Sequence, residues 1–73
     1  MKVEVRFADD KGYIAKVGMN NLIIIEDDRI TTQDGIRNRV QNIVTKYRPA
    51  YRGREYRVYH WLTDDVIFLD KAL

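Results

Sequence analysis

One segment near the middle of the chain has the apolar spacing of an α-helix that lies on a sheet. At about 100° per residue, its apolar side chains fall within an arc of roughly 100°. These side chains are Ile36, Val40, Ile43, Val44 and Tyr47. Thr31 stands three residues before Asp34, an arrangement close to a capping box, and Pro49 cannot continue a helix. The sequence therefore predicts one amphipathic helix over residues 31–47.

The segments that precede this helix have the patterns of β-strands. Apolar and charged side chains alternate over residues 3–7, which is the period-2 signature of a strand with one buried face. Apolar character resumes over residues 13–17 after a turn cluster, so residues 2–17 are predicted to form a hairpin. Residues 22–25 are continuously apolar and suit a strand that is buried on both faces.

The C-terminal third is rich in tyrosine, valine and other strand-forming residues. Residues 55–62 are therefore predicted to form a strand. The last residues allow two interpretations: a turn over residues 63–65 that leads into a strand over residues 66–69, or a helix N-cap followed by a helix. We favour the strand because the β-branched and aromatic residues there are poor helix formers.

These elements together predict an α+β fold in the order β-β-β-α-β-β. The sheet is expected to be antiparallel with four to five strands, and the amphipathic helix is expected to pack on one of its faces. A chain of 73 residues has room for one core, so residues 1–73 are interpreted as a single domain.

The residue types that the chain lacks exclude most enzyme classes. There is no cysteine and no serine, and His60 is the only histidine, which excludes thiol and serine nucleophiles and multi-histidine metal sites. Neighbouring acids such as Asp9 and Asp10 match the spacing of no known cation loop and are interpreted as turn residues. We therefore expect a protein that is not an enzyme, with no catalytic residue, no metal, no cofactor and no small-molecule substrate.

No apolar run approaches the roughly 18 residues that a membrane helix needs. The first residues alternate between apolar and charged types and contain no signal-peptide core. We therefore expect a cytoplasmic protein without a membrane partner.

The positive charge is concentrated between residues 35 and 60. Seven lysine and arginine side chains lie there against Glu55 as the one acid, and tyrosines are interleaved with them. Six of the seven are arginine, which holds carboxylates or phosphates through paired donors and stacks on aromatic rings. The segment predicts a binding surface, and its partner-binding residues are expected to be Arg37, Arg39, Lys46, Arg48, Tyr51, Arg52, Arg54, Arg57, Tyr59 and Trp61.

The cations of the predicted helix allow two interpretations. They lie along both borders of the apolar stripe with an uncharged polar crest between them, which suits a docking surface. They also fit a structural role, because cations near a helix C-terminus complement the helix dipole and arginine stems cover the rim of a core. The arginines and aromatics of residues 51–61 extend the cationic segment beyond the helix and favour the binding surface.

The stretches at residues 54–59 and 65–69 resemble the C-terminal hairpin of the RelE-like ribosome-dependent ribonuclease toxins. Those toxins place two helices after their first strand and basic catalytic groups after this hairpin, whereas Lys71, Ala72 and Leu73 follow it here. We interpret the match as generic hairpin composition, and an RNA cleavage assay tests the ribonuclease class directly.

A second resemblance concerns the whole chain. The length of 73 residues, the absence of cysteine and the basic aromatic segment from Lys46–Arg48 to Tyr59–Trp61 are similar to the small RNA-polymerase-binding regulators of lytic Xanthomonas phages. The resemblance implies a non-enzymatic protein of the host cell cytoplasm that binds bacterial RNA polymerase. It further implies that the protein inhibits initiation at host promoters and allows elongating complexes to pass terminators.

Direct binding of nucleic acid is the alternative function. The same arginines would then contact phosphates, and Tyr51, Tyr59 or Trp61 would stack on bases. If all seven cations met B-DNA phosphates, the slope of log affinity against log salt would be roughly −6. Failure to bind random duplex DNA at about 50 mM salt would therefore argue against this alternative.

Overall fold

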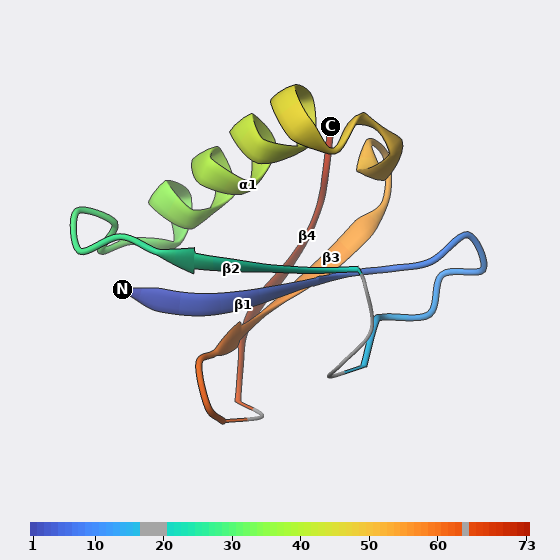
Figure 1. The fold of residues 1–73 in the computed structure, drawn as a ribbon. Coiled ribbons are helices and arrows are strands. Elements are labelled where there is room, and N and C mark those ends of the chain that lie inside the picture. The colour runs from blue at the N-terminus through green and yellow to red at the C-terminus, as the bar shows by residue number, and fades with distance from the viewer. Residues whose placement is uncertain (17–20, 64) are drawn as a thin grey trace.

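The protein folds into one antiparallel sheet with one α-helix on it. The computed structural model describes residues 1–16, 21–63 and 65–73 (Figure 1). The elements are β1 (Lys2–Phe7), β2 (Leu22–Glu26), α1 (Gln33–Tyr47), the short 3₁₀ helix η1 (Pro49–Tyr51), β3 (Glu55–His60) and β4 (Val66–Lys71). The strand order across the sheet is β2-β1-β3-β4, with every neighbouring pair antiparallel. The α+β class is confirmed, with the order β-β-α-β-β.

The predicted helix is confirmed, but its N-terminal cap is Thr32 rather than Thr31. The Oγ1 atom of Thr32 accepts a hydrogen bond from the amide of Gly35 at 3.1 Å. At the other end the helix stops at Tyr47, immediately before the residue that Pro49 biases away from helical angles.

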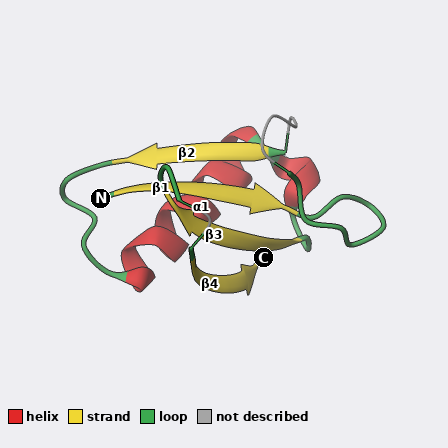
Figure 2. Ribbon diagram, turned by 90° about the horizontal axis from the view of Figure 1, so that it is seen from below, coloured by secondary structure: helices red, strands yellow, loops and turns green. Residues whose placement is uncertain are grey.

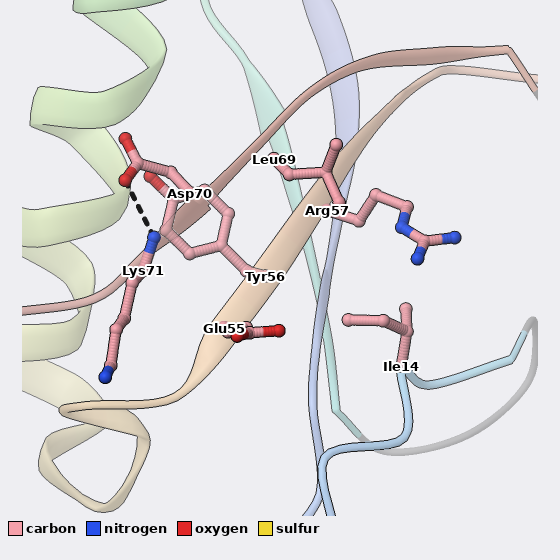
Figure 3. A pocket seen from close by; sticks show the side chains of 7 residues that line it. All are labelled: Ile14, Glu55, Tyr56, Arg57, Leu69, Asp70 and Lys71. Carbon is pink, nitrogen blue, oxygen red and sulfur yellow. Dashed lines mark hydrogen bonds between the residues drawn. The ribbon is translucent and has the colours of Figure 1, made fainter.

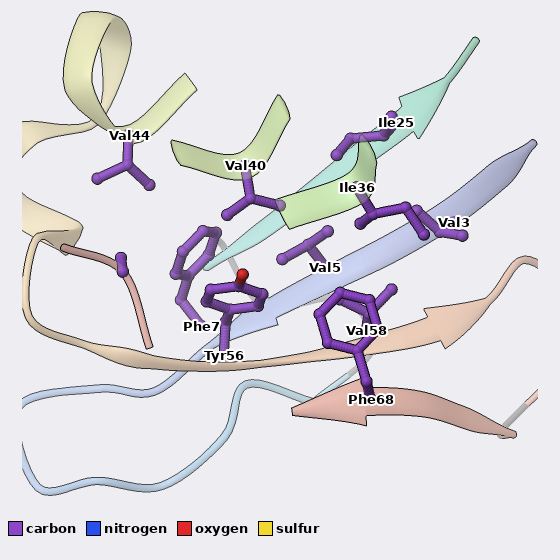
Figure 4. Close-up of a cluster of buried hydrophobic side chains, with 11 residues drawn as sticks. Val3, Val5, Phe7, Ile25, Ile36, Val40, Val44, Tyr56, Val58 and Phe68 are labelled. Atoms are coloured by element: carbon purple, nitrogen blue, oxygen red, sulfur yellow. The ribbon is translucent and has the colours of Figure 1, made fainter. Parts of the chain in front are cut away.

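The core lies between α1 and one face of the sheet (Figure 4). Alternate residues of the strands point toward the helix, and Ile36, Val40 and Val44 point from the helix toward them. The core residues are Val3, Val5, Phe7, Ile25, Ile36, Val40, Val44, Tyr56, Val58, Phe68 and Ala72. Tyr47 was expected on the apolar stripe, but it lies at the helix end beyond the core and is 73% exposed.

The predicted hairpin over residues 2–17 is wrong. β1 pairs with β2 on one side and with β3 on the other. Residues 13–16 form no strand, and a single bridge joins Ala8 to Ile14; residue 17 lies outside the described residues. Residues 22–26, which begin with four consecutive apolar side chains, pair with β1 instead, over five residue pairs.

The prediction that residues 22–25 are buried on both faces is also wrong. β2 stands at the edge of the sheet, and α1 covers only one of its faces. Ile25 points toward the helix and is 3% exposed, whereas Ile24 points the other way and is 45% exposed. A continuous apolar run does not distinguish a central strand from an edge strand with an apolar outer face.

The C-terminal strand is confirmed as β4, and the helical interpretation of this segment is wrong. β4 pairs with β3 over residues 55–59, with a bulge between Val58 and Tyr59. The predicted turn over residues 63–65 includes residue 64, which lies outside the described residues. Among the described residues, no helix is long and apolar enough to cross a membrane.

The face of the sheet opposite α1 carries no helix or second sheet in the described part of the chain. We call it the open face, and Figure 2 looks onto it. The strands place on it the alternate residues that do not enter the core. They include Lys2, Glu4, Arg6, Leu22, Ile24, Glu26, Glu55, Arg57, Tyr59, Val66, Leu69 and Lys71, and Trp61 continues the row after β3.

Candidate functional site

The ten residues predicted to bind a partner do not form one surface. Arg37, Arg39, Lys46 and Arg48 lie on or directly after α1, and Tyr51, Arg52 and Arg54 lie between α1 and β3. Arg57, Tyr59 and Trp61 lie on or beside the open face, on the other side of the sheet from the helix. The single outward patch expected from the sequence is therefore absent, because residues close in sequence are distributed over two opposite layers.

Arg37 holds the helix to the last strand. Its guanidinium group donates to the carboxylates of Asp34 at 2.9 Å and Asp70 at 2.6 Å. It also lies 4.6 Å from the centre of the Phe68 ring. The hydrogen bond to Asp70, followed by that to Asp34, raises the pKa of Arg37. These contacts use the charge of Arg37 within the fold.

Arg39 is paired in the same way with the turn that follows β2. Its guanidinium group donates to Asp27 at 2.6 Å, and Asp27 also accepts from the side chain of Arg29 at 3.0 and 3.1 Å. The bonds from the side chain and amide of Arg29, and then the bond from Arg39, hold the pKa of the Asp27 carboxyl well below its usual range. This carboxylate stays ionised and joins the helix to the turn.

Arg54 joins two loops at one end of the sheet. It donates to the carbonyl oxygens of Ala50 at 3.1 Å and Ala8 at 3.2 Å, and its guanidinium group is paired with Asp10. The ring of Tyr51 lies 5.7 Å from the same guanidinium and packs on the Phe7 ring at 4.6 Å. Tyr51 and Arg54, which were both predicted to bind a partner, therefore make contacts within the fold.

Three cations near the C-terminal end of α1 have no aspartate or glutamate partner among the described residues. They are Lys46, Arg48 and Arg52, and we call them the cationic end. Arg52 donates to the carbonyl oxygen of Leu73 at 3.3 Å. Tyr47 is exposed beside them. The partial negative charge of the helix C-terminus stabilises such cations, so their position alone fits the structural interpretation as well.

On the open face, Arg6 covers the ring of Tyr59. Its guanidinium carbon lies 3.8 Å from the ring centre, and its Nε donates to Glu4 at 2.9 Å. Arg6 is 8% exposed and Tyr59 is 7% exposed. The ring face of Tyr59 that a nucleic-acid base would need is thus occupied by an arginine of the same sheet.

Arg57 stands directly opposite Arg6 in the β1–β3 pairing. Its Nη1 donates to the Tyr59 hydroxyl at 3.4 Å, while its buried Nε has no hydrogen-bond partner within the described residues. Figure 3 shows Arg57 projecting from β3 on the side away from Tyr56 and Asp70. Arg6 and Arg57 therefore lie side by side. Arg6 is paired with Glu4, whereas Arg57 has no carboxylate partner among the described residues.

A groove of about 460 Å³ opens on the same face. Alternate residues of β1 and β2 form its floor, and the chain that leaves β3 forms its wall. Its lining residues are Glu4, Arg6, Leu22, Ile24, Trp61, Leu62 and Thr63. The two charged residues of the floor are already paired with each other, so the rest of the groove is mainly apolar.

The side chains of the groove wall are held out toward solvent. Leu62 is 84% exposed and has a φ of 68°, in the left-handed region that a leucine rarely adopts. Trp61 is 36% exposed, and the ammonium group of Lys2 lies 4.1 Å from the centre of its ring. Lys2 also pairs with Glu26 at 3.4 Å. Backbone strain of this kind concentrates at functional sites.

Of the residues predicted to bind a partner, only Trp61 lines this groove. Sequence reasoning missed Leu22 and Ile24 because an apolar run was interpreted as a strand buried on both faces. Their spacing of two residues already placed both side chains on one face of a strand. The sequence did not show which strand β2 would pair with, and so did not show which face would stay open. Nothing in the sequence indicated the left-handed backbone at Leu62.

The chemistry of the groove is that of binding by burial of apolar surface. Its lining residues provide one paired carboxylate and one paired guanidinium, together with the side chains of leucine, isoleucine and tryptophan. Over residues 1–16, 21–63 and 65–73, no group of three or more histidine, aspartate or glutamate residues is placed to hold a metal ion. A scan against protein-family models and searches of curated proteins and solved structures found no match to this chain.

Proposed function

We propose that this protein is a non-enzymatic protein-binding domain and that the groove on its open face receives the partner. The observation that carries the proposal is the apolar groove walled by Trp61 and by the exposed, backbone-strained Leu62. A monomeric surface rarely exposes apolar side chains around a concave site unless the site binds something.

The chemistry of the open face specifies what kind of segment the groove receives. Apolar side chains of the partner would cover Ile24, Trp61 and Leu62, and burying one such side chain is worth about 1.5–3 kcal/mol. The unmatched charge of Arg57, opposite Arg6, favours a carboxylate beside those apolar side chains. The partner segment is thus an apolar anchor flanked by an acidic residue, and tryptophan and arginine are frequent hot spots of such interfaces.

The pairing of the arginines supports a protein partner over nucleic acid. Arg37, Arg39 and Arg54 are bound to carboxylates of this chain. Contact with phosphates would break these pairs, so the cost of separating them opposes nucleic-acid binding. Tyr59 is covered by Arg6, which leaves it unable to stack on a base in this arrangement.

Bacterial RNA polymerase is the partner that the resemblance of the chain implies. The resemblance rests on the segment from Lys46–Arg48 to Tyr59–Trp61, and Trp61, the last residue of that segment, lines the groove. The proposed activity is inhibition of initiation together with passage of elongating complexes through terminators. It would be exerted by binding the enzyme and would need no catalytic group on this chain.

The test is retention of this protein on immobilised bacterial RNA polymerase. Leu62→Asp should abolish retention, because it places a charge at the apolar wall. Leu73→Asp is the matched control, since Leu73 is 78% exposed and lies outside the groove lining. Loss of retention for Leu62→Asp alone supports the proposal. Equal retention of both variants, or no retention of the unchanged protein, contradicts it.

A second candidate function is nucleic-acid binding at the cationic end. The observation that favours it is that Lys46, Arg48 and Arg52 have no aspartate or glutamate partner among the described residues, and that Tyr47 is exposed beside them. Three phosphate contacts predict a slope of log affinity against log salt of roughly −3 for duplex DNA. Arg48→Glu should then abolish DNA binding, while Leu62→Asp should leave it unchanged.

A further inference from the structure

The sheet has two outer edges, and the outer edge of β2 is one of them. β2 is the first strand in the order β2-β1-β3-β4, and over residues 1–16, 21–63 and 65–73 no strand lies beyond it (Figure 2). Its sequence from Leu22 to Glu26 is leucine, three isoleucines and glutamate. Such an apolar edge is a template for pairing with another chain.

The hydrogen bonds at the two ends of β2 show which of its backbone groups face outward. The amide of Phe7 donates to the carbonyl oxygen of Asn21 at 2.9 Å. The amide of Asp27 donates to the carbonyl oxygen of Met1 at 3.1 Å. Because bonded positions alternate along an antiparallel pair, Ile23 and Ile25 bond to β1. Leu22, Ile24 and Glu26 therefore direct their N–H and C=O groups away from the sheet.

The opposite edge of the sheet carries features that oppose pairing, and β2 does not. In β4 the backbone amide of Lys71 donates a hydrogen bond to the carboxylate of Asp70 at 2.8 Å, so it is not free to pair with another strand. The β3–β4 pairing also contains a bulge between Val58 and Tyr59. Bulges and edge lysines are devices that keep sheet edges from associating. In β2 the pairing with β1 is regular, and the strand has neither a lysine nor a proline.

We propose that a second copy of this chain pairs with the outer edge of β2, antiparallel and about a two-fold axis at Ile24. In this register the two Ile24 residues exchange both of their backbone hydrogen bonds. Leu22 of each copy does the same with Glu26 of the other. All the outward backbone groups of the three positions are then satisfied, and the two four-stranded sheets become one continuous sheet.

The side chains at this seam are compatible with the same register. On the open face Ile24, which is 45% exposed, meets its own copy, and Leu22 meets Glu26. On the helix side Ile23 meets Ile25 of the second copy, which extends the apolar row next to the core. No charged side chains of the same sign stand directly opposite each other, so the pairing carries no like-charge penalty.

This inference is independent of the function proposed for the groove, but it affects its geometry. The two-fold axis would run perpendicular to the continuous sheet, so both grooves would open on the same face. Leu22 and Ile24 line each groove, and the seam would bring the two grooves next to each other. The dimer would present two equivalent sites to a partner.

Oxidative cross-linking tests the register, because the natural chain has no cysteine. In Ile24→Cys the two introduced cysteines would be opposite each other with Cα atoms about 5.5 Å apart, within the range of a disulfide. In Leu22→Cys they would be four positions apart, at about 14 Å, which a disulfide does not span. Disulfide-linked dimer in the first variant, at least about tenfold faster than in the second, is the expected result. Equal rates, or no cross-link in either, would overturn the register.

Sedimentation equilibrium of the full chain tests the dimer itself. We expect a single species of twice the chain mass at high concentration. Ile24→Lys should move dissociation to at least about tenfold higher concentration, because two lysines would meet at the axis. Leu69→Lys is the control on the other edge strand, where Leu69 is 61% exposed, and it should dissociate like the unchanged protein.

Two outcomes would overturn the proposal. One is a chain that stays monomeric at all concentrations. The other is an Ile24→Lys variant whose self-association is unchanged from that of the natural chain, which would show that the two copies do not meet at Ile24. Circular dichroism of both lysine variants confirms that the fold is retained.

Discussion

The two faces of the same sheet differ in how they use their side chains. Toward α1, Val3, Val5 and Val58 are fully buried among apolar neighbours. On the open face the alternate residues of the same strands combine a covered Arg6–Tyr59 pair with an exposed apolar groove. The helix face stabilises the fold by packing, whereas the open face combines stabilising contacts with surface that is still available to a partner.

Much of the positive charge on the helix layer is paired within the fold. Arg37 and Arg39 were expected to form a docking surface, and they lie on a helix that faces solvent. Their guanidinium groups are bound to Asp70 and Asp27, which come from elements remote in sequence. A segregated charge in the sequence therefore does not establish a free charge on the surface.

The largest difference between the two faces is expected in stability. Phe7→Ala should reduce the free energy of unfolding by about 3–5 kcal/mol, because it leaves a cavity in the core. Leu69→Ala, at an exposed position of the open face, should change it by less than about 0.5 kcal/mol. Urea denaturation measures both. If Phe7→Ala does not fold, Ile36→Val should still cost about 0.5–1.5 kcal/mol. Equal effects at Phe7 and Leu69 would show that the core does not lie under α1.

A second difference is expected at high pH, on the helix side alone. Burial, followed by the nearby charge of Asp70, raises the pKa of Tyr56 to about 12 from a usual value of 10.0. The folded protein therefore holds this proton more tightly than the unfolded chain does. The resulting stabilisation is complete below pH 10 and is lost as the pH rises through about 12. Tyr56→Phe should remove this part of the pH dependence, as measured by denaturation between pH 9 and about 12. Parallel curves for the two proteins would contradict the burial of the hydroxyl.

At low pH, Asp27 and the neighbouring Asp28 are expected to differ in how much each contributes to stability. Asp27 has a pKa well below its usual value of 3.8 because it accepts from Arg29 and Arg39. Its contribution to stability is complete above the unfolded pKa and is lost as the pH falls through the lower folded value. Asp27→Asn should therefore weaken the acid dependence of unfolding. Asp28→Asn is the control, because the fully exposed side chain of Asp28 makes a 3.8 Å ion pair with the N-terminal ammonium group, and losing it should cost much less stability than losing Asp27. Equal losses of stability in the two variants would contradict the role assigned to Asp27.

The smallest effect is expected at the groove wall, and it has the opposite sign. Leu62→Asn should increase the free energy of unfolding by about 0.5–1 kcal/mol, because asparagine tolerates a positive φ better than leucine does. The same variant should weaken binding to the partner, because an apolar contact is lost. Thermal unfolding and retention on RNA polymerase measure the two effects. A variant that is less stable than the natural chain would contradict the strain assigned to Leu62.

Local patterns in the sequence were sufficient for most elements of the fold. The spacing of apolar residues located α1, the alternation over residues 3–7 identified β1, and the strand-forming composition of residues 55–62 identified β3. Strand pairing was harder, because residues 13–17 and residues 22–25 were both plausible neighbours of β1. That choice depends on contacts between remote segments, which a local pattern does not contain.

The candidate site was less predictable than the fold. Trp61 was identified from its place in a basic aromatic segment, but Ile24 and Leu62 were not. Ile24 lines the groove because its register with β1 places it on the open face beside Glu4, and the exposed Leu62 has a left-handed backbone conformation. Likewise the pairing of Arg37 with Asp70 joins residues that are 33 positions apart. All three features are consequences of tertiary structure.

The most direct test of the open face as the binding surface uses the fact that Trp61 is the only tryptophan. A protein labelled with 5-fluorotryptophan gives one fluorine resonance, from the groove wall. We predict that the chemical shift of this resonance changes when bacterial RNA polymerase is added, and that Leu62→Asp prevents the change. A resonance that only broadens, as the slower tumbling of any complex requires, and keeps its chemical shift while the polymerase binds the protein would contradict the assignment of the partner to this face.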